Sequence, residues 1–348
     1  MNYAIIGCGR IAAKHIEAAL YNHLNIIAVC DVSEAAMDRL LSEQGLDSTN
    51  IKRYTDYKIM LEKNKIDLIA ISSVSGARAG IAKDCLIAGV NLIIEKPMAL
   101  SIRDADEIIR LSEENNCKVT VCHQNRLYSS VQSVKKAVEY SMLGKVSHAA
   151  VHIRWNRGID YYSQASWRGT WVMDGGMLLN QCIHCIDMLC WLMGDTISEV
   201  YGVTKNQFHT GIETEDVALA VVKFKNGAVA IIEGTTNIYP KNLEETIYIF
   251  GQNGTVKLGG KNTNTIEHWE VAGHETPPDV SFPFGTGHKG VYADVIDAIQ
   301  NNRQPYIGVE AGRNAVELIL AIYKSQKEGK PVGLPLMDFA TIDMKEAI

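Results

Sequence analysis

Residues 1–12, MNYAIIGCGRIA, decide the fold of the first part of the chain. A short apolar run is followed at once by two glycines and then by a segment with helical spacing of apolar residues. This arrangement fits the pattern G-x-G-x-x-G/A of dinucleotide-binding turns. Gly7 allows the tight turn, Gly9 lets the backbone approach a pyrophosphate, and Ala12 keeps the helix close to the sheet. The N-terminus of the predicted helix then faces the phosphate charge.

An acidic residue stands where such a turn needs one. Asp31 ends the second predicted strand, 22 residues after Gly9. A carboxylate there accepts a hydrogen bond from a ribose 2′-hydroxyl and repels a 2′-phosphate, so the sequence predicts NAD rather than NADP. The alternative is a glycine-rich turn with a capping aspartate and no cofactor.

The first part of the chain alternates short β-rich runs with helical patterns. Strand–helix–strand alternation, with strands that read as near-continuous apolar runs, predicts a Rossmann-type doubly wound parallel sheet within residues 1–122. The predicted strands are residues 3–6, 26–30, 66–72, 91–95 and 119–122.

Residues 123–348 have a different pattern, with longer β-type runs and few helices between them. We expect an α+β domain with a large, mostly antiparallel open sheet, which binds substrate and forms a homo-dimer or homo-tetramer through that sheet. Asn226-Gly227 predicts a tight hairpin. The predicted strands are 146–155, 200–208, 216–224, 228–237, 246–250 and 255–258, and the predicted helices are 129–143, 176–193, 291–301 and 310–327.

Composition limits the possible partners. The 348 residues carry 34 Lys and Arg against 40 Asp and Glu, a net charge of -6, and 47% are hydrophobic. Mild acidity without a long basic run argues against nucleic acid or an anionic membrane as partner. No apolar stretch approaches the roughly 18 residues of a membrane span. Because the first residues enter a strand directly, we expect no signal peptide and a cytoplasmic location.

Eight cysteines raise the question of a metal. Cys182 and Cys185 have C-x-x-C spacing, but no second pair follows at a zinc-ribbon distance. We therefore expect no metal, and cysteines that pack as small hydrophobic residues in a reducing compartment.

Two further motifs resemble a known family. One is the Glu-Lys-Pro of residues 95–97, which follows a predicted strand, and the other is the stretch 174–187, DGGMLLNQCIHCID. Together with the glycine turn they resemble the Gfo/Idh/MocA family of NAD-dependent sugar and cyclitol dehydrogenases. The resemblance covers essentially the whole chain. It implies a Rossmann domain, a second α/β domain and oxidation of a secondary alcohol.

Details within the motifs are similar to one branch of that family. Asn180 stands where the family generally has Asp, and residues 73–78 lack a histidine that many members have after the third strand. Asn180-Gln181-x-x-His184, with residues 124–126, 167–171 and 234–245, resembles the UDP-N-acetylglucosaminuronate 3-dehydrogenases of bacterial surface-polysaccharide synthesis. Some of these retain NAD and recycle it with 2-oxoglutarate, and the sequence leaves open whether this chain does.

Three residues are predicted to carry the chemistry. Lys96 precedes a proline that restricts its backbone, and it falls at the carboxyl end of a strand, where open parallel sheets bind ligands. Histidine side chains ordinarily titrate near neutrality, which makes His184 a candidate for proton transfer. Asn180, four residues earlier on the same helix face, cannot titrate and is expected to orient a hydroxyl. Whether Lys96 or His184 is the base stays open, and a surface lysine and a core histidine are the plain alternatives.

The resemblance and the patterns together name two sets of contact residues. Those expected at the cofactor are Gly7, Gly9, Arg10, Ile11, Ala12, Asp31, Ser73, Glu95, Lys96, Asn125, Trp167 and Arg168. Those expected at the substrate are Lys96, Arg157, Tyr162, Asn180, Gln181, His184, Tyr239 and Lys241. For the aromatic and basic stretch around Arg157 and Tyr162, a plain loop at the sheet edge is the alternative.

Two rival functions remain at this point. One is a dehydrogenase of a free sugar or inositol, which would not need the UDP group of a nucleotide sugar. The other is a non-catalytic NAD-sensing regulator on the same fold, which has no need of Lys96 and His184.

Overall fold

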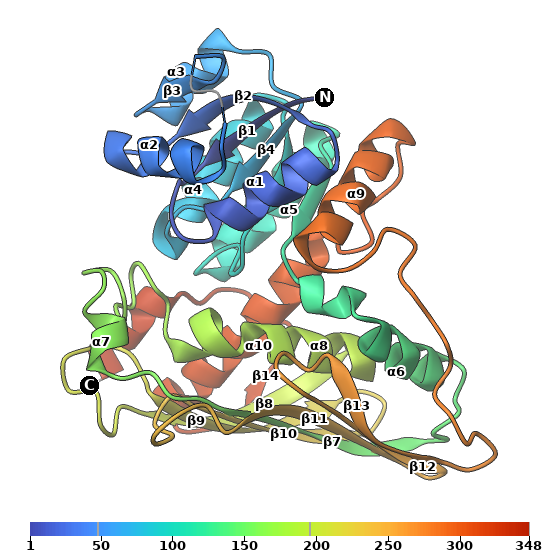
Figure 1. Ribbon diagram of the computed structural model, residues 1–348. Coiled ribbons are helices and arrows are strands. Elements are labelled where there is room, and N and C mark those ends of the chain that lie inside the picture. Colours follow the sequence, from blue (N-terminus) through green and yellow to red (C-terminus); the bar gives the residue numbers. More distant parts are fainter. Residues whose placement is uncertain (47–48, 195, 348) are drawn as a thin grey trace. The chain divides into compact units, whose positions relative to one another are not determined.

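The computed structural model describes residues 1–46, 49–194 and 196–347 (Figure 1). The chain forms two compact units, and neither is continuous in sequence. The first contains Met1–Ala99, Asp104–Gln124 and Phe284–Gly312, and the second contains Leu100–Arg103, Asn125–Pro283 and Arg313–Ile348. The predicted domain boundary between residues 122 and 123 therefore matches most of the first unit, but it assigns Phe284–Gly312 to the second domain.

The first unit is built on a six-stranded sheet in the order β3-β2-β1-β4-β5-β6, with every pair parallel. This is the strand order of dinucleotide-binding sheets, and the predicted doubly wound fold is confirmed. Only β3 was missed, because two of its three residues are exposed Lys and Arg rather than apolar. The strands are β1 (Asn2–Ile6), β2 (Asn25–Cys30), β3 (Lys52–Tyr54), β4 (Leu68–Ile71), β5 (Asn91–Ile94) and β6 (Val119–Val121).

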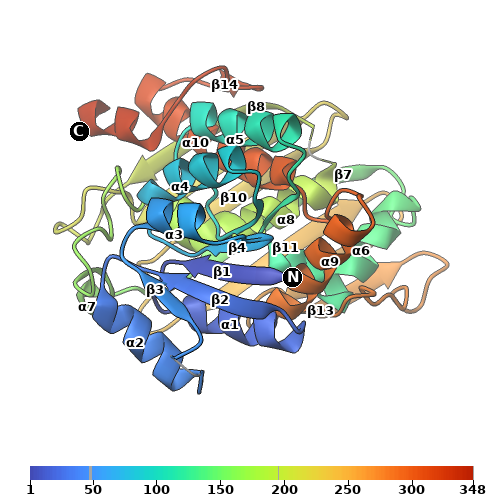
Figure 2. The same ribbon diagram turned by 90° about the horizontal axis from the view of Figure 1, so that it is seen from above.

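Helices cover both faces of this sheet, with α1 on one face and α4 on the other (Figure 2). The helices are α1 (Ala12–Tyr21), α2 (Glu34–Glu43), α3 (Tyr57–Lys63), α4 (Ser75–Ile87), α5 (Ile102–Glu114) and α9 (Gly287–Gln300). Although α9 comes late in the sequence, it packs on α1, and the Asn22 side chain donates to the carbonyl of Lys289 at 3.1 Å. The helix itself was expected, but its place in the first unit was not.

The second unit is built on an eight-stranded sheet in the order β13-β12-β11-β7-β10-β9-β8-β14. Its described pairs are antiparallel except β7–β10, so the mostly antiparallel sheet is confirmed. The predicted hairpin joins β9 and β10, with Gly227 at φ +88 and the amide of Ala228 bonded to the Asn226 side chain. The strands are β7 (Val146–Arg154), β8 (Ile197–Lys205), β9 (Val217–Phe224), β10 (Val229–Thr235), β11 (Glu244–Gly251), β12 (Gly254–Gly259), β13 (Thr265–Val271) and β14 (Val332–Gly333).

Helices α6, α8 and α10 lie over one face of this sheet, and the other face is open in Figure 1. The helical segments are η1 (Gln124–Leu127), α6 (Ser129–Glu139), α7 (Ile159–Tyr162), η2 (Leu178–Cys182), α8 (Ile183–Met193), α10 (Val309–Glu328) and η3 (Thr341–Ala347). Exposed apolar residues follow neighbouring strands of the sheet: Tyr201, Val203, Leu219, Val221, Val229 and Ile231. A homo-dimer or homo-tetramer through this sheet stays a prediction. Across the described residues, every helix is too short or too polar to cross a membrane.

A buried ion pair connects η1 to α8 in the second unit. Arg126 donates from Nε and Nη2 to the two carboxylate oxygens of Asp187, at 2.8 and 2.7 Å, and both side chains are almost fully buried. A paired geometry of this kind is specific as well as strong. The pair therefore holds the helix that carries His184.

Replacing Asp187 by Asn is expected to destabilise the fold, because it leaves the Arg126 guanidinium buried without its counter-charge. Such losses amount to about 3–5 kcal/mol. Urea unfolding of the variant measures the free energy change. The matched control is Asp338→Asn, which breaks the exposed ion pair with Arg103 and should cost about 1 kcal/mol or less. Equal losses in the two variants would contradict the prediction.

Candidate active site

The turn after β1 has the geometry of a phosphate-binding loop. Gly7 has φ +97, and a Cβ on it would lie 2.5 Å from the amide nitrogen of Ser73, so only glycine fits. A Cβ on Gly9 would meet no atom within 4 Å. The neighbours therefore do not require glycine at position 9, and its bare backbone is open to a ligand. The first turn of α1 has no acidic residue, and its N-cap, Ile11, makes no side-chain cap bond, which leaves the amides suited to an anion.

Asp31 lies beside this turn, as predicted. Its carboxylate accepts hydrogen bonds from the amide of Cys8 at 2.7 Å and from the amide of Ser33 at 2.9 Å. The acid is thus held against the glycine turn and stays half-buried. These residues fit the adenosine end of NAD, and a contact of Asp31 with the ribose hydroxyl stays a prediction. Arg10 is exposed at the same turn.

The loops after β4 and β5 are joined by an arginine that sequence reasoning missed. Arg78 is 6% exposed, and its guanidinium donates to the carbonyls of Ser73 and Pro97, at 2.7 Å each. It therefore holds the chain next to Lys96, which is half-buried. The available signal was an arginine in the first turn of the helix after β4. Long basic side chains are rarely buried without partners, so an arginine close to the sheet indicates a specific contact.

Glu95 is deeply buried in the first unit. Its side chain is 7% exposed, and it accepts hydrogen bonds from His15, His288 and the amide of Lys96. Its expected contact with the cofactor stays a prediction, while its contacts within the protein are plain.

In the second unit, the predicted helix 176–193 starts differently from expectation. Its first part, η2, is a π-helical turn, and regular α-helix begins only at Ile183. Single π-turns of this kind occur often at functional sites. Asn180, Gln181 and His184 are half-buried, whereas most of their neighbours in η2 and α8 are buried. The predicted side chains therefore remain accessible on an otherwise buried segment.

Asn180 is held in one orientation by its neighbours. Its amide group donates to a carboxylate oxygen of Asp174 and accepts from Gln181 Nε2 at 2.8 Å. The other oxygen of Asp174 accepts from the amide of Gly169 at 2.8 Å. Asn180 is thus fixed as a hydrogen-bonding group, and its expected role of orienting a hydroxyl stays a prediction.

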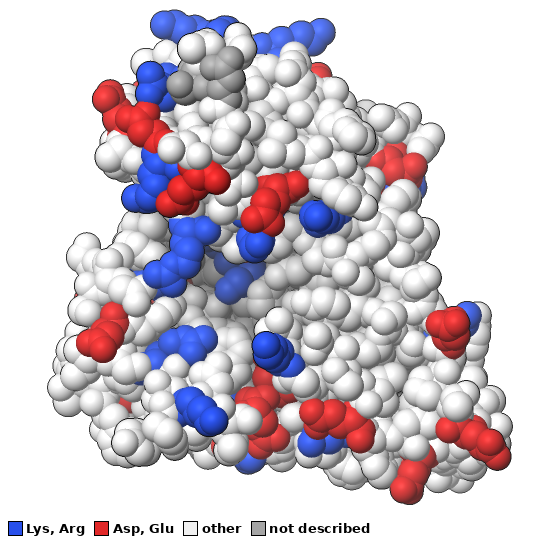
Figure 3. All heavy atoms as spheres, viewed as in Figure 1, with Lys and Arg blue, Asp and Glu red and all other residues white. Residues whose placement is uncertain are grey.

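The network continues to a group of arginines and aromatic rings. Arg157 donates to Gln181 Oε1 at 2.9 Å, and Gln181 Nε2 donates to the hydroxyl of Tyr161 at 2.8 Å. The guanidinium of Arg168 lies 4.3 Å from the centre of the Tyr161 ring and 4.5 Å from that of Trp167. Tyr161, which belongs to the predicted aromatic and basic stretch around Arg157 and Tyr162, lies at the centre of this group. Basic side chains gather beside α7 on the face shown in Figure 3.

Among the remaining predicted residues, Tyr162 packs against this network, with its ring centre 5.1 Å from that of Tyr161. Tyr162 bonds through its hydroxyl to Thr236 at 3.3 Å, while Tyr239 and Lys241 are exposed after β10. Asn125 is buried, with its amide group 3.4 Å from the carbonyl of Asn262. Lys96 belongs to the first unit, and His184 to the second.

The C-x-x-C cysteines pack against other side chains. The thiol of Cys182 lies 3.2 Å from the sulfur of Met177, and that of Cys185 lies 3.0 Å from a carboxylate oxygen of Glu245. All eight cysteines, each within the described residues, are buried thiols.

A buried acid supports the start of η2. Glu215 Oε1 accepts from the amide of Leu178 at 2.9 Å and from the hydroxyl of Tyr323 at 2.6 Å. Burial raises the pKa of Glu215 to about 8, against the opposing hydrogen bond from Tyr323. The group is therefore mostly a neutral acid near pH 7.

Family models match both parts of the chain. Residues 1–123 match the NAD-binding Rossmann fold of the Gfo/Idh/MocA oxidoreductase family, and residues 135–334 match its C-terminal alpha/beta domain. The chain belongs to this family. It is accordingly an NAD-dependent dehydrogenase, as the resemblance implied.

Individual relatives span nearly the whole chain. The WlbA dehydrogenase from Bordetella pertussis, solved with NADH and UDP-GlcNAcA, is 31% identical, with coverage of 96% of this chain and 99% of its own and a TM-score of 0.87. Myo-inositol 2-dehydrogenase of Thermotoga maritima is 23% identical, with coverage of 96% and 98%. A D-apiose dehydrogenase of Paraburkholderia graminis is 21% identical, with coverage of 96% and 90%.

Replacing Asp31 by Ala is expected to weaken NADH binding by about tenfold or more, because a hydrogen bond to a charged acceptor is lost. NADPH binding should weaken less, since the variant no longer repels a 2′-phosphate. Fluorescence titrations with both cofactors measure the ratio. Ser33→Ala is the matched control, because it removes the cap of α2 and leaves the carboxylate in place. An unchanged ratio in Asp31→Ala would contradict this role.

Stability is expected to depend on pH through Glu215. Its folded pKa of about 8 lies above the ordinary value of 4.5, so the folded state holds the proton more tightly. The stability that this proton gives is present below about pH 4.5 and is lost as the pH rises towards 8, by at most about 1.4 kcal/mol per pH unit. Glu215→Gln should lose less stability than the wild type between pH 5 and 8 in urea unfolding. The exposed Glu275→Gln is the control, and parallel curves for Glu215→Gln and wild type would refute this assignment.

Proposed function

We propose that the protein oxidises carbon 3 of UDP-N-acetylglucosaminuronic acid to a ketone, with NAD as hydride acceptor, in bacterial surface-polysaccharide synthesis. The observation that carries this proposal is the full-length likeness, at 31% identity, to a WlbA dehydrogenase crystallised with NADH and UDP-GlcNAcA. The hydrogen-bonded network around Asn180 and Gln181 supports it.

Oxidation of the substrate's alcohol releases a hydride from the carbon and a proton from the hydroxyl group, and each needs an acceptor. NAD, when bound, supplies the acceptor for the hydride that leaves the carbon, and the protein must take the hydroxyl proton. Lys96 and His184 are the candidates for that proton. Asn180, held by Asp174, then orients the sugar hydroxyl.

The basic and aromatic group suits an anionic substrate. The guanidinium groups of Arg157 and Arg168 lie over the rings of Trp155, Tyr161 and Trp167. The distances from guanidinium carbon to ring centre are 4.3 to 5.4 Å. Guanidinium groups held in this way lose little freedom when they bind a diphosphate or a carboxylate. In a protein with a net charge of -6, such a local concentration of positive charge favours binding of an acidic nucleotide sugar.

A dehydrogenase of a free sugar or cyclitol is the second candidate. The inositol and apiose dehydrogenases among the relatives favour it, at 23% and 21% identity. An enzyme of that kind would act without a UDP group. A purely sensory role has less support, because the chain keeps both Lys96 and His184.

The deciding experiment follows the absorbance of NADH after purified protein is mixed with UDP-N-acetylglucosaminuronate, with and without added NAD. An increase is expected, and an increase without added NAD would show retained cofactor, which 2-oxoglutarate should then reoxidise. Glucuronate and myo-inositol, tested in parallel, represent the second candidate. Turnover of these compounds alone would overturn the nucleotide-sugar assignment.

Lys96→Ala is the matching variant. It should lower kcat by at least about a hundredfold, the usual contribution of a proton-transferring group, while NADH binding measured by fluorescence changes little. Unchanged turnover would remove Lys96 from the mechanism.

A further inference from the structure

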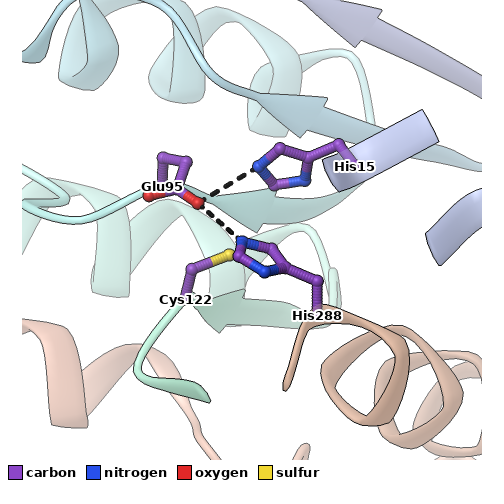
Figure 4. Close-up of side chains that lie close together, drawn as sticks. All are labelled: His15, Glu95, Cys122 and His288. Carbon is purple, nitrogen blue, oxygen red and sulfur yellow. Dashed lines mark hydrogen bonds and ion pairs between the residues drawn. The ribbon is translucent and has the colours of Figure 1, made fainter. Parts of the chain in front are cut away.

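A polar cluster is buried in the first unit beside Lys96. It consists of His15 from α1, Glu95 after β5, Cys122 after β6 and His288 from α9 (Figure 4). The side chains of His15 and Glu95 are 0% and 7% exposed, and that of His288 is 13% exposed. Both imidazole rings point to the same carboxylate oxygen, with Nε2 of His15 at 3.2 Å and Nε2 of His288 at 3.0 Å.

The hydrogen bonds of this cluster form one consistent chain. The hydroxyl of Tyr292 lies 2.9 Å from Nδ1 of His15 and 2.8 Å from the hydroxyl of Tyr3. With His15 donating from Nε2, its Nδ1 accepts from Tyr292, which in turn accepts from Tyr3. Each of these buried groups then has a partner.

The neighbours keep Glu95 ionised. Burial by itself would raise the pKa of Glu95, but the hydrogen bonds from His15 and His288 outweigh burial and hold it well below its usual value. Burial also lowers the pKa of His15, which keeps that ring neutral. A buried carboxylate with several hydrogen-bond donors is a fixed, permanent charge.

This carboxylate is connected directly to Lys96, one of the two candidates for the proton acceptor. Glu95 Oε2 accepts from the backbone amide of Lys96 at 3.1 Å. On the other side of Lys96, Arg78 donates to the carbonyl of Pro97 at 2.7 Å. The backbone before and after Lys96 is thus anchored at two points inside the first unit.

We propose that Glu95 is the positioning residue of Lys96 in place of the cofactor contact that the sequence predicts, and that His15 and His288 serve to hold its carboxylate. This inference rests on the proposed function in that Lys96 takes part in proton transfer. Glu95 acts by fixing the direction of the lysine backbone, through the hydrogen bond that its carboxylate accepts from the Lys96 amide.

A metal ion is the competing explanation, because two imidazoles, a thiol and a carboxylate have ligand atoms within 4.8 Å of one another. The hydrogen bonds argue for the positioning role. Nε2 of both histidines is already bonded to Glu95, and the positive charges of Arg78 and Lys96 act on the Cys122 thiol. A cation would have to displace these bonds and enter a site that already has two basic neighbours.

The test compares Glu95→Gln with wild type in two independent assays. In the first, kcat of the full-length enzyme should fall by roughly tenfold to a hundredfold, as for a misplaced catalytic group, while KM for NAD changes by less than about threefold. In the second, acetic anhydride labels lysines at a fixed pH, and mass spectrometry reads Lys96. The labelling rate of Lys96 should change by about threefold or more, because its side chain is no longer held in one direction.

Two further variants separate positioning from simple loss of stability. His288→Ala should change both assays in the same direction as Glu95→Gln, and His288→Gln, which keeps a donor, should restore most of the wild-type behaviour. Thr120→Val removes a buried hydrogen bond to the carbonyl of Ile307 in the same unit. It should lower the melting temperature without changing kcat or the labelling of Lys96.

Three results would overturn the proposal. One is unchanged labelling and unchanged kcat in both Glu95→Gln and His288→Ala. Another is a loss of NADH affinity above about tenfold with normal labelling, which would make Glu95 a cofactor contact. The third is about one equivalent of a transition metal in the purified wild type that disappears in Glu95→Gln. If the wild type oxidises none of the sugars, the proposed function fails, whereas the labelling assay still decides the effect of Glu95 on Lys96.

Discussion

A carboxylate removed from water must be given partners, and the first unit is organised around one such group. Glu95 directly follows β5, where burial makes an unpaired charge strongly unfavourable. Its partners come from α1, from the residue after β6 and from α9. One of these partners, His288, comes from a helix in the last quarter of the sequence. The carboxylate also accepts a hydrogen bond from the backbone amide of Lys96, which anchors the chain there.

The same constraint recurs in the second unit. Asp187 is paired with Arg126, Asp174 is bonded by Asn180 and the amide of Gly169, and Glu215 is bonded by Tyr323 and Leu178. Each of these acids contacts η2, α8 or the loop before them. The helix that carries Asn180 and His184 is therefore fixed by buried polar bonds at several points, and its functional side chains need little rearrangement to meet a ligand.

Local pattern predicted the parts that depend on neighbours in sequence. The glycine turn, the apolar strands and the Asn226-Gly227 hairpin follow from backbone sterics and from the need to cover both faces of a sheet. Elements without a local signature were missed. β3 has polar exposed residues, β13 has a pattern in which most side chains are exposed, and the π-turn in η2 looks like ordinary helix in sequence.

The sequence by itself determined the two sheet architectures, the cofactor turn with Asp31, and the identity of Lys96, Asn180 and His184 as candidates. These features rest on interactions between residues a few positions apart or on short motifs. Only the tertiary structure showed that α9 belongs to the first unit, that Arg78 joins two loops, and that Glu95 is held by two histidines. The partners in these contacts come from 5 to 193 positions away in sequence, and no local pattern encodes which buried charge a distant donor will meet.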